Sequence, residues 1–67
     1  MNYKELKIEM IRHGFTVGEM AKIVGVGRKA YYMKCRGKTE FKQSEILALK
    51  KALELSDERV AEIFFAE

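Results

Sequence analysis

Apolar residues recur along this chain at intervals of three and four positions, the spacing that places side chains on one face of a helix. The first such stripe consists of Tyr3, Leu6, Met10 and Ile11. It predicts a helix from about Asn2 to His13, which Gly14 ends. We expect this stripe to be the buried face of that helix.

A second helix begins with a recognisable cap. Thr16 and Glu19 stand three positions apart and match a capping box, which predicts a helix from about Val17 to Val24. Gly18 inside this helix costs up to about 1 kcal/mol relative to alanine. The apolar positions of the helix are Met20, Ile23 and Val24, with the small Ala21 between them.

Glycines separate the next elements. Gly25 can adopt the left-handed conformation that ends a helix, and a third helix is expected from about Arg28 to Arg36, ended by Gly37. A fourth is expected from about Lys42 to Glu54. Its apolar set is Ile46, Leu49 and Leu53, with Leu47 and Ala48 beside it.

Ser56, followed by Asp57 and Glu58, predicts the start of a fifth helix, because negative charge in the first turn suits the helix dipole. The residues expected on its buried face are Val60, Ile63 and Phe64. The chain shows no alternating strand pattern and no internal repeat. We therefore expect an all-α fold of five short helices in a single domain over residues 1–67.

Composition and charge fit a small folded domain with one basic part. Hydrophobic residues make up 48% of the 67 positions and charged residues 34%, which is typical of a globular chain. Residues 1–42 carry ten basic and four acidic side chains, a net +6, whereas residues 43–67 carry three and six, a net −3. Such a split suits a protein that presents one face to a polyanion.

Chemistry other than binding has little support in the sequence. Cys35 is the single cysteine, so an intrachain disulfide is excluded and a metal site is not indicated. No nucleophile–base pair or phosphate-binding loop is present, so we expect neither an enzyme nor a cofactor or small-molecule ligand. Charges interrupt the first twelve residues, which lack the apolar run of a signal peptide or membrane span. We expect a reducing cytosol and no membrane partner.

Ala21, Gly25 and Val26, with the stretch GVGRKAYYMKCRG, give the chain a family resemblance. It resembles the Cro and repressor type of phage helix-turn-helix protein, a lambda-repressor-like fold, and the segments RGKTEF and KALELSDERV extend the likeness over nearly the whole chain. The resemblance implies a helix-turn-helix over about residues 16–37. It also implies an operator-binding homodimer in the cytosol of a bacterial host, beside the nucleoid.

Three positions depart from the family pattern. Val17 stands where the family often has a phosphate-contacting Gln, and Gly27 stands where Ser or Thr often caps the third helix. Lys34 occupies a position that is often apolar, so we expect its stem to be buried and its ammonium to reach a phosphate.

Helical spacing divides the third helix into two faces. Tyr31 and Cys35 are expected to face the core. Arg28 and Lys29 lie in the first turn, the part of a recognition helix that reaches base edges, and an Arg there can donate two hydrogen bonds to guanine. The expected DNA-contacting set is Thr16, Arg28, Lys29, Tyr32, Met33, Arg36, Lys38 and Thr39.

The sequence supports two interpretations for some of these positions. Arg28 and Lys29 can also be solvated charges, and Tyr32 can cover core surface instead of contacting DNA. Phe64 and Phe65 diverge by about 100° on a helix, so one can be left for a partner in a dimer formed through the fifth helix, or both can pack on the core.

These patterns predict a sequence-specific regulator of transcription that binds double-stranded operator DNA as a dimer. The alternative is a small helical module that binds another regulatory protein, since a fold alone does not fix function. A continuously positive surface around the third helix would favour DNA, and an apolar patch there would favour a protein partner.

Overall fold

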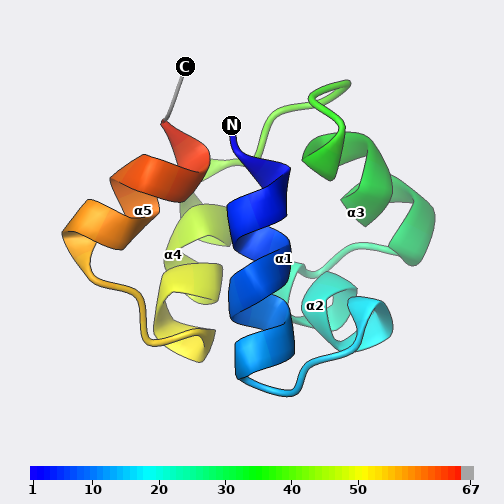
Figure 1. Ribbon diagram of the computed structural model, residues 1–67. Coiled ribbons are helices and arrows are strands. Elements are labelled where there is room, and N and C mark those ends of the chain that lie inside the picture. Colours follow the sequence, from blue (N-terminus) through cyan, green and yellow to red (C-terminus); the bar gives the residue numbers. More distant parts are fainter. Residues whose placement is uncertain (66–67) are drawn as a thin grey trace.

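The computed structural model describes residues 1–65, which form five helices and no strand (Figure 1). The helices are α1 (Tyr3–Arg12), α2 (Val17–Val24), α3 (Arg28–Cys35), α4 (Gln43–Ala52) and α5 (Asp57–Phe64). The all-α fold of five helices is therefore confirmed, and the expected boundaries agree within two residues. None of these helices is long and apolar enough to cross a membrane.

Local caps explain why the helices begin where they do. The backbone N–H of Glu19 donates to Oγ1 of Thr16 at 3.2 Å, and the N–H of Thr16 donates to the Glu19 carboxylate at 2.9 Å. This is the expected capping box of α2. Asn2 and Ser56 accept equivalent backbone hydrogen bonds at the starts of α1 and α5.

The first four helices end in the same way. A residue with left-handed backbone follows the helix, and the N–H of the next residue donates to the carbonyl five positions before it. In α2 the left-handed residue is Gly25, with φ of 88°, and the N–H of Val26 donates to the carbonyl of Ala21 at 3.0 Å. Gly14 and Gly37 take the same place after α1 and α3. After α4 the left-handed residue is Glu54 and not a glycine. This helix ends at Ala52, two positions before its expected end.

The five helices enclose one small core (Figure 1). Figure 1 places α2 and α3 on one side of α1 and α5 on the other. The fully buried larger side chains are Leu6, Met20, Tyr31, Leu49, Leu53 and Ile63. Arg59 joins α5 to the central α1, because its guanidinium donates to Glu5 at 2.8 Å and to the buried Glu9 at 2.7 Å.

The structure corrects the expected buried face of α1 at Ile11. Ile11 is 64% exposed, because it lies about 100° around α1 from Met10 and so leaves the buried face. Leu47 is likewise 55% exposed on α4. Phe64 is buried, as expected for α5, whereas the adjacent Phe65 is 66% exposed, so Phe65 is the one of the two that a partner could contact.

Candidate nucleic-acid interface

The N-terminus of α3 differs from those of the other four helices. Each of those helices carries an acidic residue in its first turn, but α3 begins with Arg28 and Lys29 and has none. Gly27 precedes it and provides no side-chain cap. Positive charge therefore stands at the positive end of the helix dipole, an arrangement that favours an anion nearby.

The inward face of α3 is anchored in the core. Tyr31 is 1% exposed and its ring meets Phe41 edge-on, with centroids 6.2 Å apart. Cys35 is also buried, and burial raises the pKa of its thiol to about 11, so the thiol stays protonated and acts as an apolar side chain. Both positions confirm the inward face expected from helical spacing.

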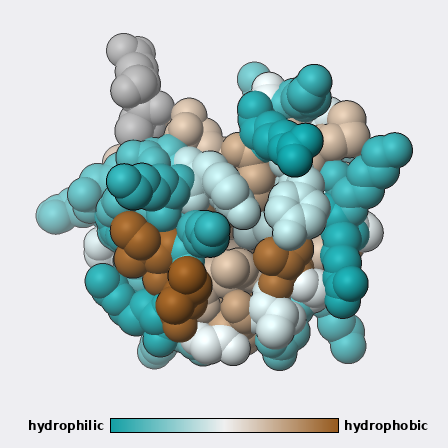
Figure 2. All heavy atoms as spheres, turned by 45° about the vertical axis from the view of Figure 1, so that its right-hand side comes forward, coloured by the Kyte–Doolittle hydropathy of each residue, from teal (hydrophilic) through white to brown (hydrophobic). Residues whose placement is uncertain are grey.

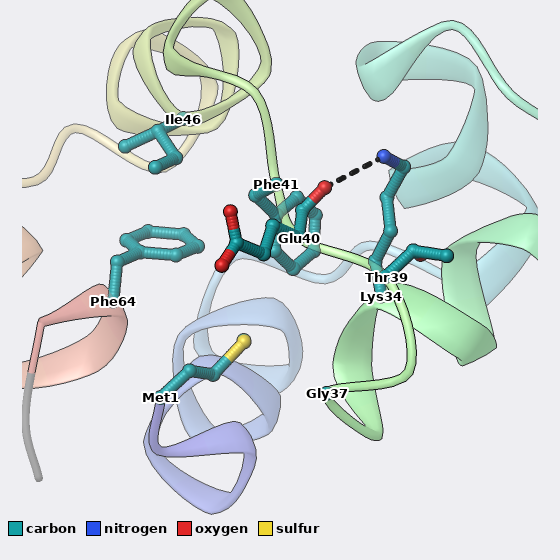
Figure 3. Close-up of a pocket in the computed structure, with 8 residues that line it drawn as sticks. All are labelled: Met1, Lys34, Gly37, Thr39, Glu40, Phe41, Ile46 and Phe64. Atoms are coloured by element: carbon teal, nitrogen blue, oxygen red, sulfur yellow. Dashed lines mark hydrogen bonds between the residues drawn. The ribbon is translucent and has the colours of Figure 1, made fainter.

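A buried ion pair joins α3 to α4. The Lys34 ammonium lies 3.0 Å from the Glu45 carboxylate and donates to the backbone carbonyl of Glu40, also at 3.0 Å (Figure 3). It lies 5.9 Å from the centre of the Phe41 ring. The stem of Lys34 is buried as expected, but its ammonium is bound within the protein, so the expected phosphate contact is wrong.

Glu45 is held ionised in this pair. Burial by itself would raise the pKa of its carboxyl, but the backbone N–H of Lys42 and the Lys34 ammonium together bring that pKa below its ordinary value. The N–H of Lys42 donates to the Glu45 carboxylate at 2.7 Å. This charge pair fixes the loop after α3 as well as the helix, because Lys34 also holds Glu40.

The outward face of α3 carries the residues expected to contact DNA. Arg28, Lys29, Tyr32 and Arg36 are exposed, and Met33 is partly buried. Lys38 and Thr39 are exposed in the turn that follows, and the N–H of Lys38 donates to the carbonyl of Met33 at 2.9 Å. One helix and the turn after it thus present most of the predicted set. Thr16 is exposed at the start of α2.

The cations of this surface form no ion pair with the acidic side chains of the described residues. No ion pair within residues 1–65 involves the side chains of Arg28, Lys29, Arg36 or Lys38. The paired cations lie elsewhere, at Arg12, Lys34, Lys50 and Arg59. Figure 2 turns the α3 side toward the viewer and shows hydrophilic side chains projecting along that side.

The first turn of α2 contacts the start of α3 through Arg28. A Cβ at Gly18 would lie 2.8 Å from Nη2 and 3.0 Å from Nε of the Arg28 guanidinium, so that group lies directly against Gly18. Val17, beside it, is partly buried and packs on the core. The sequence did not predict the contact between Gly18 and Arg28. The available signal was the glycine inside a helix, which indicates that another group approaches its backbone closely.

Two further observations concern the binding of small ligands and metal ions. A hollow of about 260 Å³ beside the loop after α3 is lined by residues that include Phe41, Phe64 and Met1, and the Glu40 carboxylate points toward Phe64 (Figure 3). Within residues 1–65, no three His, Cys, Asp or Glu side chains gather to hold a metal ion.

Comparison of the chain with models of protein families, with curated proteins and with solved structures gives no match.

Proposed function

We propose that this chain is a sequence-specific regulator that binds double-stranded DNA, with α2 and α3 acting as a helix-turn-helix of the Cro and repressor type. The observation that carries the proposal is the surface of α3 and its following turn. Four cations there are exposed and form no ion pair within residues 1–65. The opposite face of α3 is buried in the core. A polyanion supplies the missing counter-charge, and cytosolic DNA is the polyanion that a helix of this kind fits.

The residues divide into two roles. Arg28 and Lys29 stand in the first turn of α3, where a recognition helix meets base edges in the major groove. Tyr32 adds a phosphate contact or an apolar contact to a thymine methyl. The residues assigned to phosphates are Thr16, Arg36, Lys38 and Thr39, and Met33 contributes apolar surface between the two groups.

The distribution of apolar surface favours DNA over a protein partner at α3. The exposed large apolar side chains within residues 1–65 are Met1, Ile8, Ile11, Tyr32, Leu47 and Phe65. Of these, Tyr32 belongs to α3. The surface of α3 is therefore basic with one amphipathic ring, which suits DNA better than the apolar groove of a protein-interaction module.

A dimer completes the proposal. Leu47 and Phe65 border a groove of about 330 Å³ between α4 and α5, together with Ile46 and Val60. Lys50 and Asp57, which form an ion pair, lie at the same groove, so one self-complementary patch offers both apolar and charged contacts. Two copies joined there would present two α3 helices to successive major grooves, which are about 34 Å apart.

Selection of bound duplexes from random DNA tests the proposal, with salt titrations on the selected site. If Arg36, Lys38 and one of the two first-turn cations each neutralise a phosphate in both subunits, log K falls against log salt with a slope near −5. Arg28→Ala is expected to relax the preference at one base position, while Lys38→Ala weakens all sequences about equally and makes the slope shallower. Lys51→Ala, which changes an exposed lysine on α4, is the matched control and should leave binding unchanged.

Enrichment of a near-palindromic site together with this salt dependence would support the proposal. A salt-independent interaction, or equal binding of selected and scrambled duplexes by the wild-type protein, would contradict it and favour the protein-interaction module.

A further inference from the structure

Gly18 lies in the first turn of α2, where a helix has no need of glycine. No positive φ occurs there, so its backbone conformation is open to any residue. What sets Gly18 apart is its neighbour. The three atoms nearest to a Cβ placed on it are Nη2, Nε and Cζ of Arg28, at 2.8, 3.0 and 3.4 Å.

These distances also orient the guanidinium. Nη2 and Nε are both closer to the Cβ position than Cζ is, so the edge of the guanidinium formed by those two nitrogens faces α2. An Arg side chain can bind guanine through that edge or through its end, where the two Nη atoms stand. With the first edge turned to Gly18, the end bearing Nη1 is left for a ligand.

We infer that Gly18 is a positioning residue that sets the base preference of Arg28. The missing side chain at Gly18 leaves room in which the guanidinium lies against the first turn of α2, and this contact selects one direction for a long side chain that would otherwise sample many. The inference rests on the proposed function, because a preference for bases exists only if α3 reads DNA.

The fold does not depend on this contact, which makes the inference testable. In Gly18→Ala the atoms that must move belong to the tip of a flexible exposed side chain, and alanine is the better helix former. We expect the midpoint of thermal unfolding to stay the same or to rise by a few degrees. The added methyl group instead displaces the Arg28 guanidinium.

The experiment is a double-mutant cycle on duplexes selected with the wild-type protein, with each base pair of the site varied in turn. Gly18→Ala is expected to lose about tenfold in preference at the one position where Arg28→Ala also loses it. In the Arg28→Ala background, Gly18→Ala should change nothing further. This second arm excludes direct contact between the new methyl group and DNA.

A measurement without DNA accompanies the cycle. In the NMR spectrum of the free protein, the Nε–Hε resonance of Arg28 should shift in Gly18→Ala, while that of Arg36 stays in place as the internal reference. Unchanged base preference in Gly18→Ala, an unmoved Arg28 resonance, or an equal loss in the Arg28→Ala background would each overturn the inference. If the proposed function is wrong, the wild-type protein itself shows no base preference. That result overturns this inference as well.

Discussion

Glu54 has a left-handed backbone, with φ of 51°, in the place where α1, α2 and α3 are followed by glycine. The N–H of Leu55 donates to the carbonyl of Lys50 at 2.9 Å, which is the same hydrogen bond over five positions that follows α1, α2 and α3. Leu55 is thereby turned into the core. Because a Cβ is disfavoured at positive φ, Glu54 holds this turn at a cost of about 1 kcal/mol.

Glu54→Gly is therefore expected to raise the free energy of unfolding by about 1 kcal/mol, measured by denaturant titration. Glu54→Gln is the matched control, since it removes the carboxylate that lies 3.7 Å from His13 but keeps the strained backbone. A glycine variant no more stable than the glutamine variant would show that the left-handed turn carries no such cost.

At the scale of the helices, the contact between α3 and α4 depends on a charge pair as well as on apolar packing. Lys34 and Glu45 are both buried, and removal of one charge leaves the other without a partner. We expect Glu45→Gln to lower the free energy of unfolding by about 2 kcal/mol at pH 7. Glu58→Gln, at an exposed carboxylate of α5, is the control and should change it by a few tenths.

The pair also predicts the direction of a pH effect. The pKa of Glu45 is lower in the folded protein than its ordinary value of 4.5, so the unfolded chain takes up this proton first as the pH falls. The contribution of Glu45 to stability is thus complete above about pH 5 and is lost as the pH drops through the folded pKa. Denaturant titrations from pH 7 to pH 3 should show the wild-type advantage over Glu45→Gln shrinking in that window, and a constant difference would contradict it.

At the scale of the whole molecule, the proposed DNA surface and the apolar groove lie on different sides. Figure 1 shows α3 at one edge and α5 at the opposite edge, with α1 between them. Both surfaces can therefore be occupied at once, as a DNA-bound dimer requires.

Leu47→Asp is expected to weaken the proposed self-association at least tenfold, because it places a charge in the groove between α4 and α5. The monomer should stay folded, since Leu47 is already largely exposed. Ile11→Asp introduces the same charge at a similarly exposed position on α1 and should leave association unchanged. Sedimentation equilibrium over a range of concentrations measures both, and loss of the dimer in Ile11→Asp alone would move the interface to α1.

Much of the surface of α3 could be predicted from the sequence, because helical spacing decides which residues share a face. Tyr31 and Cys35 are buried and Arg28, Lys29 and Tyr32 are exposed, as that spacing indicates. The direction of the Arg28 side chain and the partner of Lys34 could not be predicted. Each depends on a residue that lies ten or eleven positions away along the chain and belongs to another helix.

The sequence by itself determined the number of helices and, within two residues, the starts of all five and the ends of the first four, because caps and glycine turns act within about five residues. Thr16 with Glu19 and the left-handed Gly25 are examples. The tertiary structure alone decided which of two adjacent apolar residues is buried, as at Met10 and Ile11. The physical reason is that a helical period allows a face about 100° wide, and only the packing of the neighbouring helices sets where that face is covered.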